Sequence, residues 1–128
     1  MAGKWCDEGE NRALNILLGS TSVDATLQLG LYTNTSEPAE SDTLSAIVEP
    51  SGNGYARKDL TRGSWTIVSD LAEYAEQTFT ASGGAWGNVY GYFITVGGKL
   101  IAAEQFTNAP YNVTDGSNVK VTPKIRCA

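Results

Sequence analysis

The stretch Val89–Phe106 constrains the fold more than any other part of the chain, because two strand-like runs are separated there by only two residues. Val89–Val96 and Lys99–Phe106 are rich in β-branched and aromatic residues, and Gly97-Gly98 lies between them. Two glycines supply the positive φ angles of a tight β-hairpin turn. The turn predicts the cross-strand pairs Val96–Lys99, Thr95–Leu100, Ile94–Ile101, Phe93–Ala102, Tyr92–Ala103, Gly91–Glu104, Tyr90–Gln105 and Val89–Phe106.

Both faces of this predicted hairpin are largely apolar. Side chains alternate across a strand, so a hairpin with one face in water has one polar face. We therefore expect the hairpin at the centre of a sheet, with one face on the core. The other face is then covered by the N-terminal segment or by another subunit.

The N-terminal segment, residues 1–20, predicts one short helix over Glu8–Leu18. Asp7 and Glu10 have the spacing of a capping box, and Gly19 fits a left-handed stop position. A helix this short is marginal in isolation. It is expected to pack its apolar stripe on the sheet or on a neighbouring subunit, and the stripe consists of Ala13, Leu14, Leu17 and Leu18.

Short strand-like runs separated by turn signals fill the remainder of the chain. We read them at Thr26–Thr33, Tyr55–Leu60, Ser64–Val68, Tyr74–Ala81 and Val119–Cys127, whereas the type of Thr43–Val48 stays open. About seven or eight short strands indicate a mainly β fold, an antiparallel β-sandwich of the Ig-like or jelly-roll kind. The 128 residues are expected to form a single domain.

The last run, Val119–Cys127, has the cleanest alternation in the chain. Pro123 lacks a backbone donor, so the run is expected at a sheet edge or with a bulge. Its inward set is predicted to be Val119, Val121, Pro123, Ile125 and Cys127, and its outward, mostly basic set Lys120, Thr122, Lys124 and Arg126.

Composition argues against several classes of function. The chain has no histidine and a net charge of −5, and it carries no phosphate-binding glycine motif. We therefore expect no catalytic, cofactor or metal site, no nucleic-acid partner and no small-molecule substrate. No apolar run is long enough to cross a membrane, and no signal peptide is visible. Cys6 and Cys127 are compatible with a bridge between the chain ends and with two reduced thiols.

Aromatic side chains leave one further alternative open. They could stack on sugars, or they could pack in the core or at subunit contacts, which aromatic residues dominate. Trp86 lies in a glycine-rich loop and is the candidate glycan contact under the first reading. The aromatic set considered is Trp65, Trp86, Tyr90, Tyr92 and Tyr111.

Seven segments carry a resemblance to known proteins, and they are Gly9–Gly19, Leu29–Asn34, Gly54–Leu60, Thr78–Ala81, Val89–Thr95, Ala103–Phe106 and Val121–Ile125. In their order and spacing they resemble small structural proteins of tailed bacteriophages, some of which are head decoration (cement) proteins. The resemblance implies a non-enzymatic virion protein, assembled in the host cytoplasm, whose partners are the major capsid protein and copies of itself. A tail or tail-fibre component that binds a carbohydrate receptor is the alternative.

The surplus of apolar surface predicts assembly. The second face of the hairpin and the leucine stripe of the helix both need a covering surface. We expect a homo-oligomer, a trimer, with the N-terminal segment at or near the contacts. The candidate interface comprises Leu14, Leu17, Leu18, Tyr90 and Tyr92, and Lys120, Lys124 and Arg126 are expected to face acidic groups on a shell protein.

Overall fold

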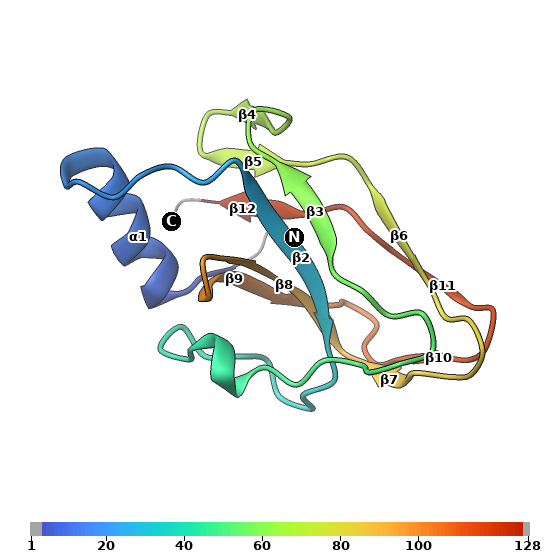
Figure 1. Cartoon of the computed structure of the whole chain (residues 1–128). Coiled ribbons are helices and arrows are strands. Elements are labelled where there is room, and N and C mark those ends of the chain that lie inside the picture. The colour runs from blue at the N-terminus through green and yellow to red at the C-terminus, as the bar shows by residue number, and fades with distance from the viewer. Residues whose placement is uncertain (1–3, 127–128) are drawn as a thin grey trace.

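The computed structural model describes residues 4–126, which form one α-helix, one 3-10 helix and four antiparallel sheets (Figure 1). The helix α1 spans Asp7–Leu18, and the 3-10 helix η1 spans Leu44–Ala46 within the segment whose type the sequence left open. The strands are β1 (Lys4–Trp5), β2 (Thr26–Tyr32), β3 (Lys58–Thr61), β4 (Thr66–Val68), β5 (Leu71–Glu73), β6 (Gln77–Thr80), β7 (Gly87–Val89), β8 (Gly91–Val96), β9 (Lys99–Gln105), β10 (Tyr111–Val113), β11 (Asn118–Val121) and β12 (Lys124–Arg126).

The predicted hairpin lies in the interior of the largest sheet. This sheet has the strand order β1-β9-β8-β2-β3, so β8 and β9 each have a second neighbour. Gly97 and Gly98 form the turn with φ angles of 57° and 77°. The central position expected from two apolar faces is therefore confirmed.

The predicted register of the hairpin is correct only next to the turn. Val96 pairs with Lys99 and Thr95 with Leu100, but Ile94 pairs with Ala102 instead of Ile101. From Ile94 to Gly91 every predicted pair is thus wrong by one residue on β9, and Val89 pairs with Tyr111 of β10 instead of Phe106. The cause is a β-bulge, in which Ile101 is an extra residue that strict alternation does not allow for.

The bulge lets Ile101 and Ala102 enter the same apolar cluster although they are adjacent in the sequence. This main cluster lies between the large sheet and the shorter strands opposite it. Its contributors include Leu29, Leu31 and Leu60 from the large sheet, and Phe79, Val119, Val121 and Ile125 from the other strands. In Figure 1 the strands β5, β6, β11 and β12 lie across from β2, β8 and β9.

The second face of the hairpin is covered by the chain itself. Phe93, Leu100 and Ala103 form a smaller buried cluster with Cys6 and Tyr32. Leu44 and Ile47, in and after η1, pack against this cluster. No neighbouring subunit is needed to cover the face, because the segment after β2 does so. The N-terminal segment contributes Cys6 to the same cluster.

The C-terminal run is interrupted at the proline, as its missing donor predicted. β11 and β12 belong to different sheets, and β12 is an edge strand in the order β12-β5-β4. Val119, Val121, Pro123 and Ile125 are buried, so their predicted inward set is confirmed as far as residue 126. Cys127 lies outside the described residues, so its pairing with Cys6 stays a prediction.

Two details of the predicted helix ends are wrong. Cys6 occupies the N-cap position and no side chain caps the helix, so Asp7 is the first helical residue. The start is set instead by backbone bonding, since Cys6 N–H donates to Ile101 O at 2.9 Å. Gly19 ends the helix at φ −105°, outside the left-handed region. The mainly β, antiparallel class with one N-terminal helix is confirmed.

Candidate functional site

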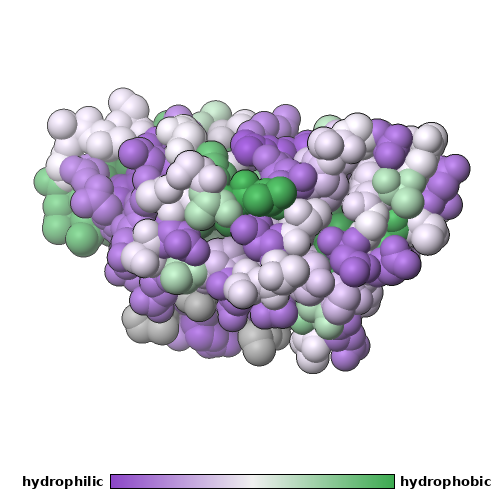
Figure 2. Space-filling view, turned by 90° about the horizontal axis from the view of Figure 1, so that it is seen from below, coloured by the Kyte–Doolittle hydropathy of each residue, from purple (hydrophilic) through white to green (hydrophobic). Residues whose placement is uncertain are grey.

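The outward face of α1 carries the most concentrated exposed apolar surface of the described chain. Leu14 is 56% exposed, Leu17 78% and Leu18 83%, and Val23 in the following loop is 49% exposed. We call these four residues the leucine surface. Figure 2 shows hydrophobic residues gathered at the left end of the molecule, where Figure 1 places α1. Contiguous apolar surface of this kind is typical of interaction sites.

The helix packs on its own sheet through its other face. Gly9 is the buried residue of α1, and Arg12, Ala13 and Ile16 are half-buried. These positions follow the i, i+3, i+4, i+7 spacing of one helix face. Of the two partners expected for the leucine stripe, its own sheet is therefore excluded for Leu14, Leu17 and Leu18.

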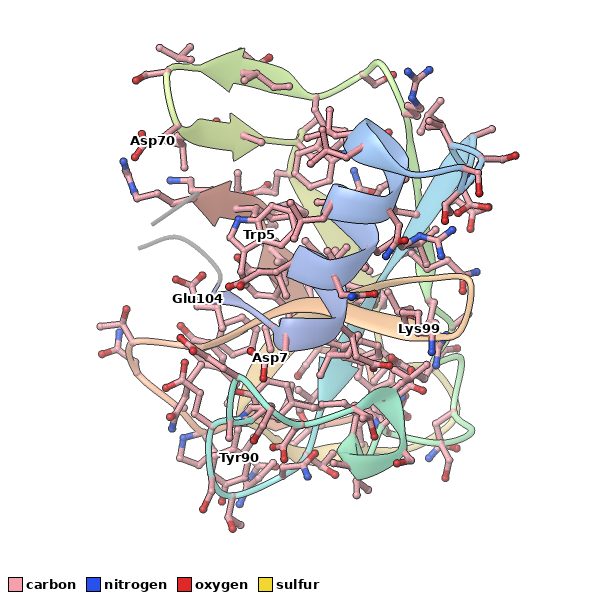
Figure 3. All side chains as sticks on the ribbon, turned by 90° about the vertical axis from the view of Figure 1, so that its left-hand side faces the viewer. Trp5, Asp7, Asp70, Tyr90, Lys99 and Glu104 are labelled. Atoms are coloured by element: carbon pink, nitrogen blue, oxygen red, sulfur yellow. The ribbon has the colours of Figure 1, made fainter. Side chains whose placement is uncertain are left out.

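Several contacts fix the orientation of α1. The Leu100 N–H donates to the Glu8 carboxylate at 3.2 Å, and Lys99 Nζ lies 3.5 Å from the same side chain. The Asp7 N–H donates to Glu40 O at 2.8 Å. In Figure 3 the helix lies in front of the sheet, starting at Asp7 and passing the turn that carries Lys99. The leucine surface is consequently held outward by a docked helix.

An ion pair and a small apolar pocket lie between α1 and the sheet. Arg12 is paired with Asp24, which links the helix to the segment that enters β2. The pocket has a volume of about 230 Å³ and includes Trp5, Ile16 and Leu27 in its wall. The helix therefore does not fill the space beneath it completely.

The tyrosines of the predicted interface are placed inward. Tyr92 is 2% exposed, and its hydroxyl donates to Lys124 O at 3.2 Å. It belongs to the core of this chain and not to a surface that another chain could contact. Tyr90 is half-buried and packs against the smaller cluster.

The basic row of the C-terminal run is largely neutralised within the chain. Lys124 Nζ lies 3.5 Å from Glu73, and Arg126 lies 3.0 Å from Asp70. Lys120 is exposed and makes no ion pair with any side chain in residues 4–126. Of the three predicted contacts to a shell protein, only Lys120 presents an uncompensated charge.

Trp86 is committed to contacts inside its own chain. Its indole N–H donates to Asn53 O at 2.9 Å, and its ring meets Tyr55 edge-on at 5.4 Å between centroids. The side chain is half-buried. A glycan could therefore reach only part of this ring, and its donor is already used.

A buried network fixes the loop that precedes β3. Glu49 accepts from the Tyr55 hydroxyl at 2.7 Å and from Arg57 at 2.9 and 3.1 Å. Burial favours the neutral form of Glu49, but the hydrogen bonds from Arg57 and Tyr55 outweigh it and hold the pKa below its usual range. The Tyr55 oxygen also accepts from Leu31 N–H at 3.0 Å. Each member is bonded to another, so the network reads as structural.

Glu104 on β9 is the most unusual titratable group. The residue is 9% exposed, and its Oε2 has no hydrogen-bond partner within residues 4–126. Burial raises the pKa of this carboxyl, and the neighbouring Tyr92 and Lys124 lower it by less. Trp5 pairs with Ala102, two residues from Glu104, so both side chains lie on one face of the sheet (Figure 3). A second carboxylate, Glu37, lies near enough for its charge to raise the pKa of Glu104 further.

Comparison with family models and with curated proteins found no match to this chain. Within residues 4–126, no group of three or more Cys, Asp or Glu side chains is placed to hold a metal ion. None of the helices in the described part of the chain has the length and apolarity to cross a membrane. The sequence predicts the leucines of α1 as interface residues. Which face of α1 packs on the sheet and which face is exposed is visible only in the structure.

Proposed function

We propose that the protein is a non-enzymatic structural component of a phage virion, a decoration protein that stabilises the head by binding the major capsid protein and copies of itself. The observation that carries this proposal is the leucine surface, which a docked helix presents outward. The resemblance of the sequence segments to phage decoration proteins gives the assembly its setting.

The size of the exposed surface makes association the favoured use. Full burial of a leucine side chain contributes about 1.5–3 kcal/mol. Leu17 and Leu18 retain most of their exposed area in this chain, at 78% and 83%. Burying them, with Leu14 and Val23, against another chain would contribute a favourable free energy of association that the monomer does not gain.

A second copy of this chain is the proposed occupant of the leucine surface, in a trimer. Copies of one helix can bury identical leucine faces against each other around a symmetry axis. Lys120, which lies on β11 away from α1, is then left to face an acidic group on the capsid protein. The net charge of −5 suits a position away from packaged DNA.

Analytical ultracentrifugation tests the self-association. We expect the wild-type chain to sediment as a trimer at tens of micromolar and the triple variant Leu14→Gln, Leu17→Gln, Leu18→Gln to sediment as a monomer with an unchanged far-UV spectrum. The matched control replaces Ile67 and Val68 with threonine, because both are exposed apolar residues on β4, at 71% and 68%. This control is expected to remain a trimer. A monomeric wild-type chain contradicts the proposed assembly.

Electron cryo-microscopy of purified particles tests the location. The proposal expects density for the protein on the outer surface of the head, at points where capsid subunits meet. Density at the tail tip, or absence of the protein from the particles, would overturn the assignment.

A further inference from the structure

A groove lies at the end of the molecule opposite α1, and of its lining residues only Lys120 has a role in the assembly described above. It lies between β10 and β11, which belong to two different two-stranded sheets and are joined by the turn at residues 114–117. In Figure 1 these strands lie at the right, remote from the helix. The groove has a volume of about 460 Å³ and is lined by Phe106, Tyr111, Asn112, Val113, Ser117, Asn118, Val119 and Lys120.

An aromatic ring lies in the wall of this groove. Tyr111 is 42% exposed, and its ring packs on Phe106 with centroids 5.1 Å apart. Phe106 in turn packs on the buried Tyr92 at 6.3 Å. Three rings therefore run from the core to the surface, and the outermost ring is exposed with Phe106 as its support.

Polar residues share the lining of the groove with this ring. The side-chain Oδ1 of Asn118 accepts from the Thr80 hydroxyl at 2.7 Å, which orients the amide and leaves its NH₂ group to donate. Asn112 follows Tyr111 on β10 and is exposed. Lys120, two residues after Asn118 on the same strand, brings the positive charge that has no partner in residues 4–126.

We propose that this groove binds a pyranose sugar of a glycan, with preference for a sugar that carries a carboxylate. The apolar C–H face of a pyranose ring stacks on an aromatic side chain, because both surfaces are flat and apolar. The Asn118 NH₂ group then donates to a ring hydroxyl, and the Asn112 amide can both donate to and accept from the ring hydroxyls. Lys120 binds the carboxylate through a charge-assisted hydrogen bond.

The alternative occupant of a mixed groove is a protein segment, which the observations favour less. The aromatic residues of the lining are Tyr111 and the half-buried Phe106, and the remaining lining residues are valines or polar. A few well-placed polar groups beside one apolar wall are typical of small-ligand sites. The proposal does not depend on the oligomeric state, because α1 and the leucine surface lie at the other end of the chain.

A glycan array followed by titration of the bound glycan tests the proposal. The array carries matched neutral and carboxylated glycans, with uronic and sialic acids as the acidic sugars. We expect binding to at least one carboxylated glycan, with shifts of the Asn112 and Asn118 side-chain amide resonances on titration. No binding to any glycan, or shifts confined to other residues, overturns the site.

Four variants separate the roles of the groove residues. Tyr111→Ala is expected to weaken binding at least tenfold, whereas Tyr111→Phe keeps the ring and retains binding within about threefold. Lys120→Gln is expected to abolish the preference for the carboxylated glycan. Lys99→Gln removes the same charge at the distant hairpin turn and is expected to leave the preference unchanged.

Three outcomes contradict the proposal. Undiminished binding by Tyr111→Ala overturns the stacking role of the ring. Equal binding of neutral and carboxylated glycans by the wild-type chain overturns the role of Lys120. If Lys99→Gln loses binding to the same degree as Lys120→Gln, the loss is an effect of net charge, and the proposed contact between Lys120 and the carboxylate is wrong.

Discussion

Replacing Gly9 with alanine is expected to destabilise the fold, although alanine is the better helix former. Gly9 lies in the first half of α1, where an Ala in place of Gly ordinarily stabilises a helix by about 1 kcal/mol. A Cβ at this position would lie 2.4 Å from Ile101 O and 2.9 Å from Ile101 Cα. Both atoms belong to the backbone of β9, so no side chain can move aside to relieve the clash.

The sign of the effect follows from comparing the two contributions. Overpacking of a filled interior costs about 1–3 kcal/mol. The upper part of that range applies here, because a shift of the helix also weakens the bond from Cys6 N–H to Ile101 O and the bond from Leu100 N–H to Glu8. The free energy of unfolding is therefore expected to fall by about 1–2 kcal/mol after the helix-propensity gain is subtracted.

Equilibrium urea unfolding measures this change as a lower midpoint at an unchanged m-value. Asn11→Ala is the matched control, because it substitutes the same helix at an exposed position outside the leucine surface. Its expected change is within about 0.5 kcal/mol. If Gly9→Ala equals or exceeds the wild-type stability, α1 does not dock on Ile101 and the outward orientation of the leucine surface loses its basis.

Two buried carboxyls predict opposite pH dependences. Burial raises the pKa of Glu104, so the free energy of unfolding is expected to fall as pH rises from the ordinary carboxyl pKa through the raised one. Glu104→Gln should reduce this fall and be more stable than the wild-type chain at pH 7. The pKa of Glu49 is lowered, so its stabilisation is present above the ordinary pKa and lost as pH falls through the lowered one. Glu49→Gln is accordingly expected to lose about 1–3 kcal/mol near pH 7 and to be less sensitive to acid, as urea unfolding from pH 3 to pH 8 measures.

The parts of the fold that the sequence predicted depend on local chemistry. Gly97-Gly98 determines the turn without reference to the remaining chain, and the apolar character of both hairpin faces implies a central position. The alternation of Val119, Val121 and Ile125 likewise identifies their buried side. Each of these signals is contained within one continuous stretch of the chain, so a single sequence is sufficient to read them.

The face of α1 that contacts the sheet could not be predicted from the sequence. The leucines form the more apolar stripe, and apolar periodicity leaves its partner open between the chain's own sheet and a neighbouring subunit. The helix approaches its own sheet through Gly9 and Ala13, whose small size allows a close contact with β9. Periodicity identifies both faces but does not say which of them meets the chain's own sheet.

The sequence also does not predict which aromatic residue lines the groove. Tyr111 was considered only as one of five aromatic residues, and Trp86 was preferred because of its glycine-rich loop. The difference between the two arises from partners far along the chain, since Asn53 uses the indole N–H of Trp86 and Phe106 supports the ring of Tyr111. Long-range contacts of this kind leave no local pattern.

The bulge at Ile101 explains both the wrongly predicted register of the hairpin and the position of the helix α1. In a regular hairpin Ile101 would face Ile94, and its position would be used by the ladder with β8. As an extra residue it instead accepts from Cys6 N–H at 2.9 Å, and its backbone lies against Gly9. The bulge thus provides the contact on which α1 docks.

Deleting Ile101 should therefore separate the hairpin from the helix. Leu100 already pairs with Thr95 and Ala102 with Ile94, so removal of the residue between them leaves a regular ladder with the same partners. The helix loses its docking contact, and the core loses one isoleucine, at a cost of about 2–5 kcal/mol. Hydrogen exchange is expected to show fast exchange throughout α1 while the amides of Ala102 and Ala103 stay protected. If α1 remains protected, or if protection is lost from the hairpin and the helix together, the bulge is not the element that positions the leucine surface.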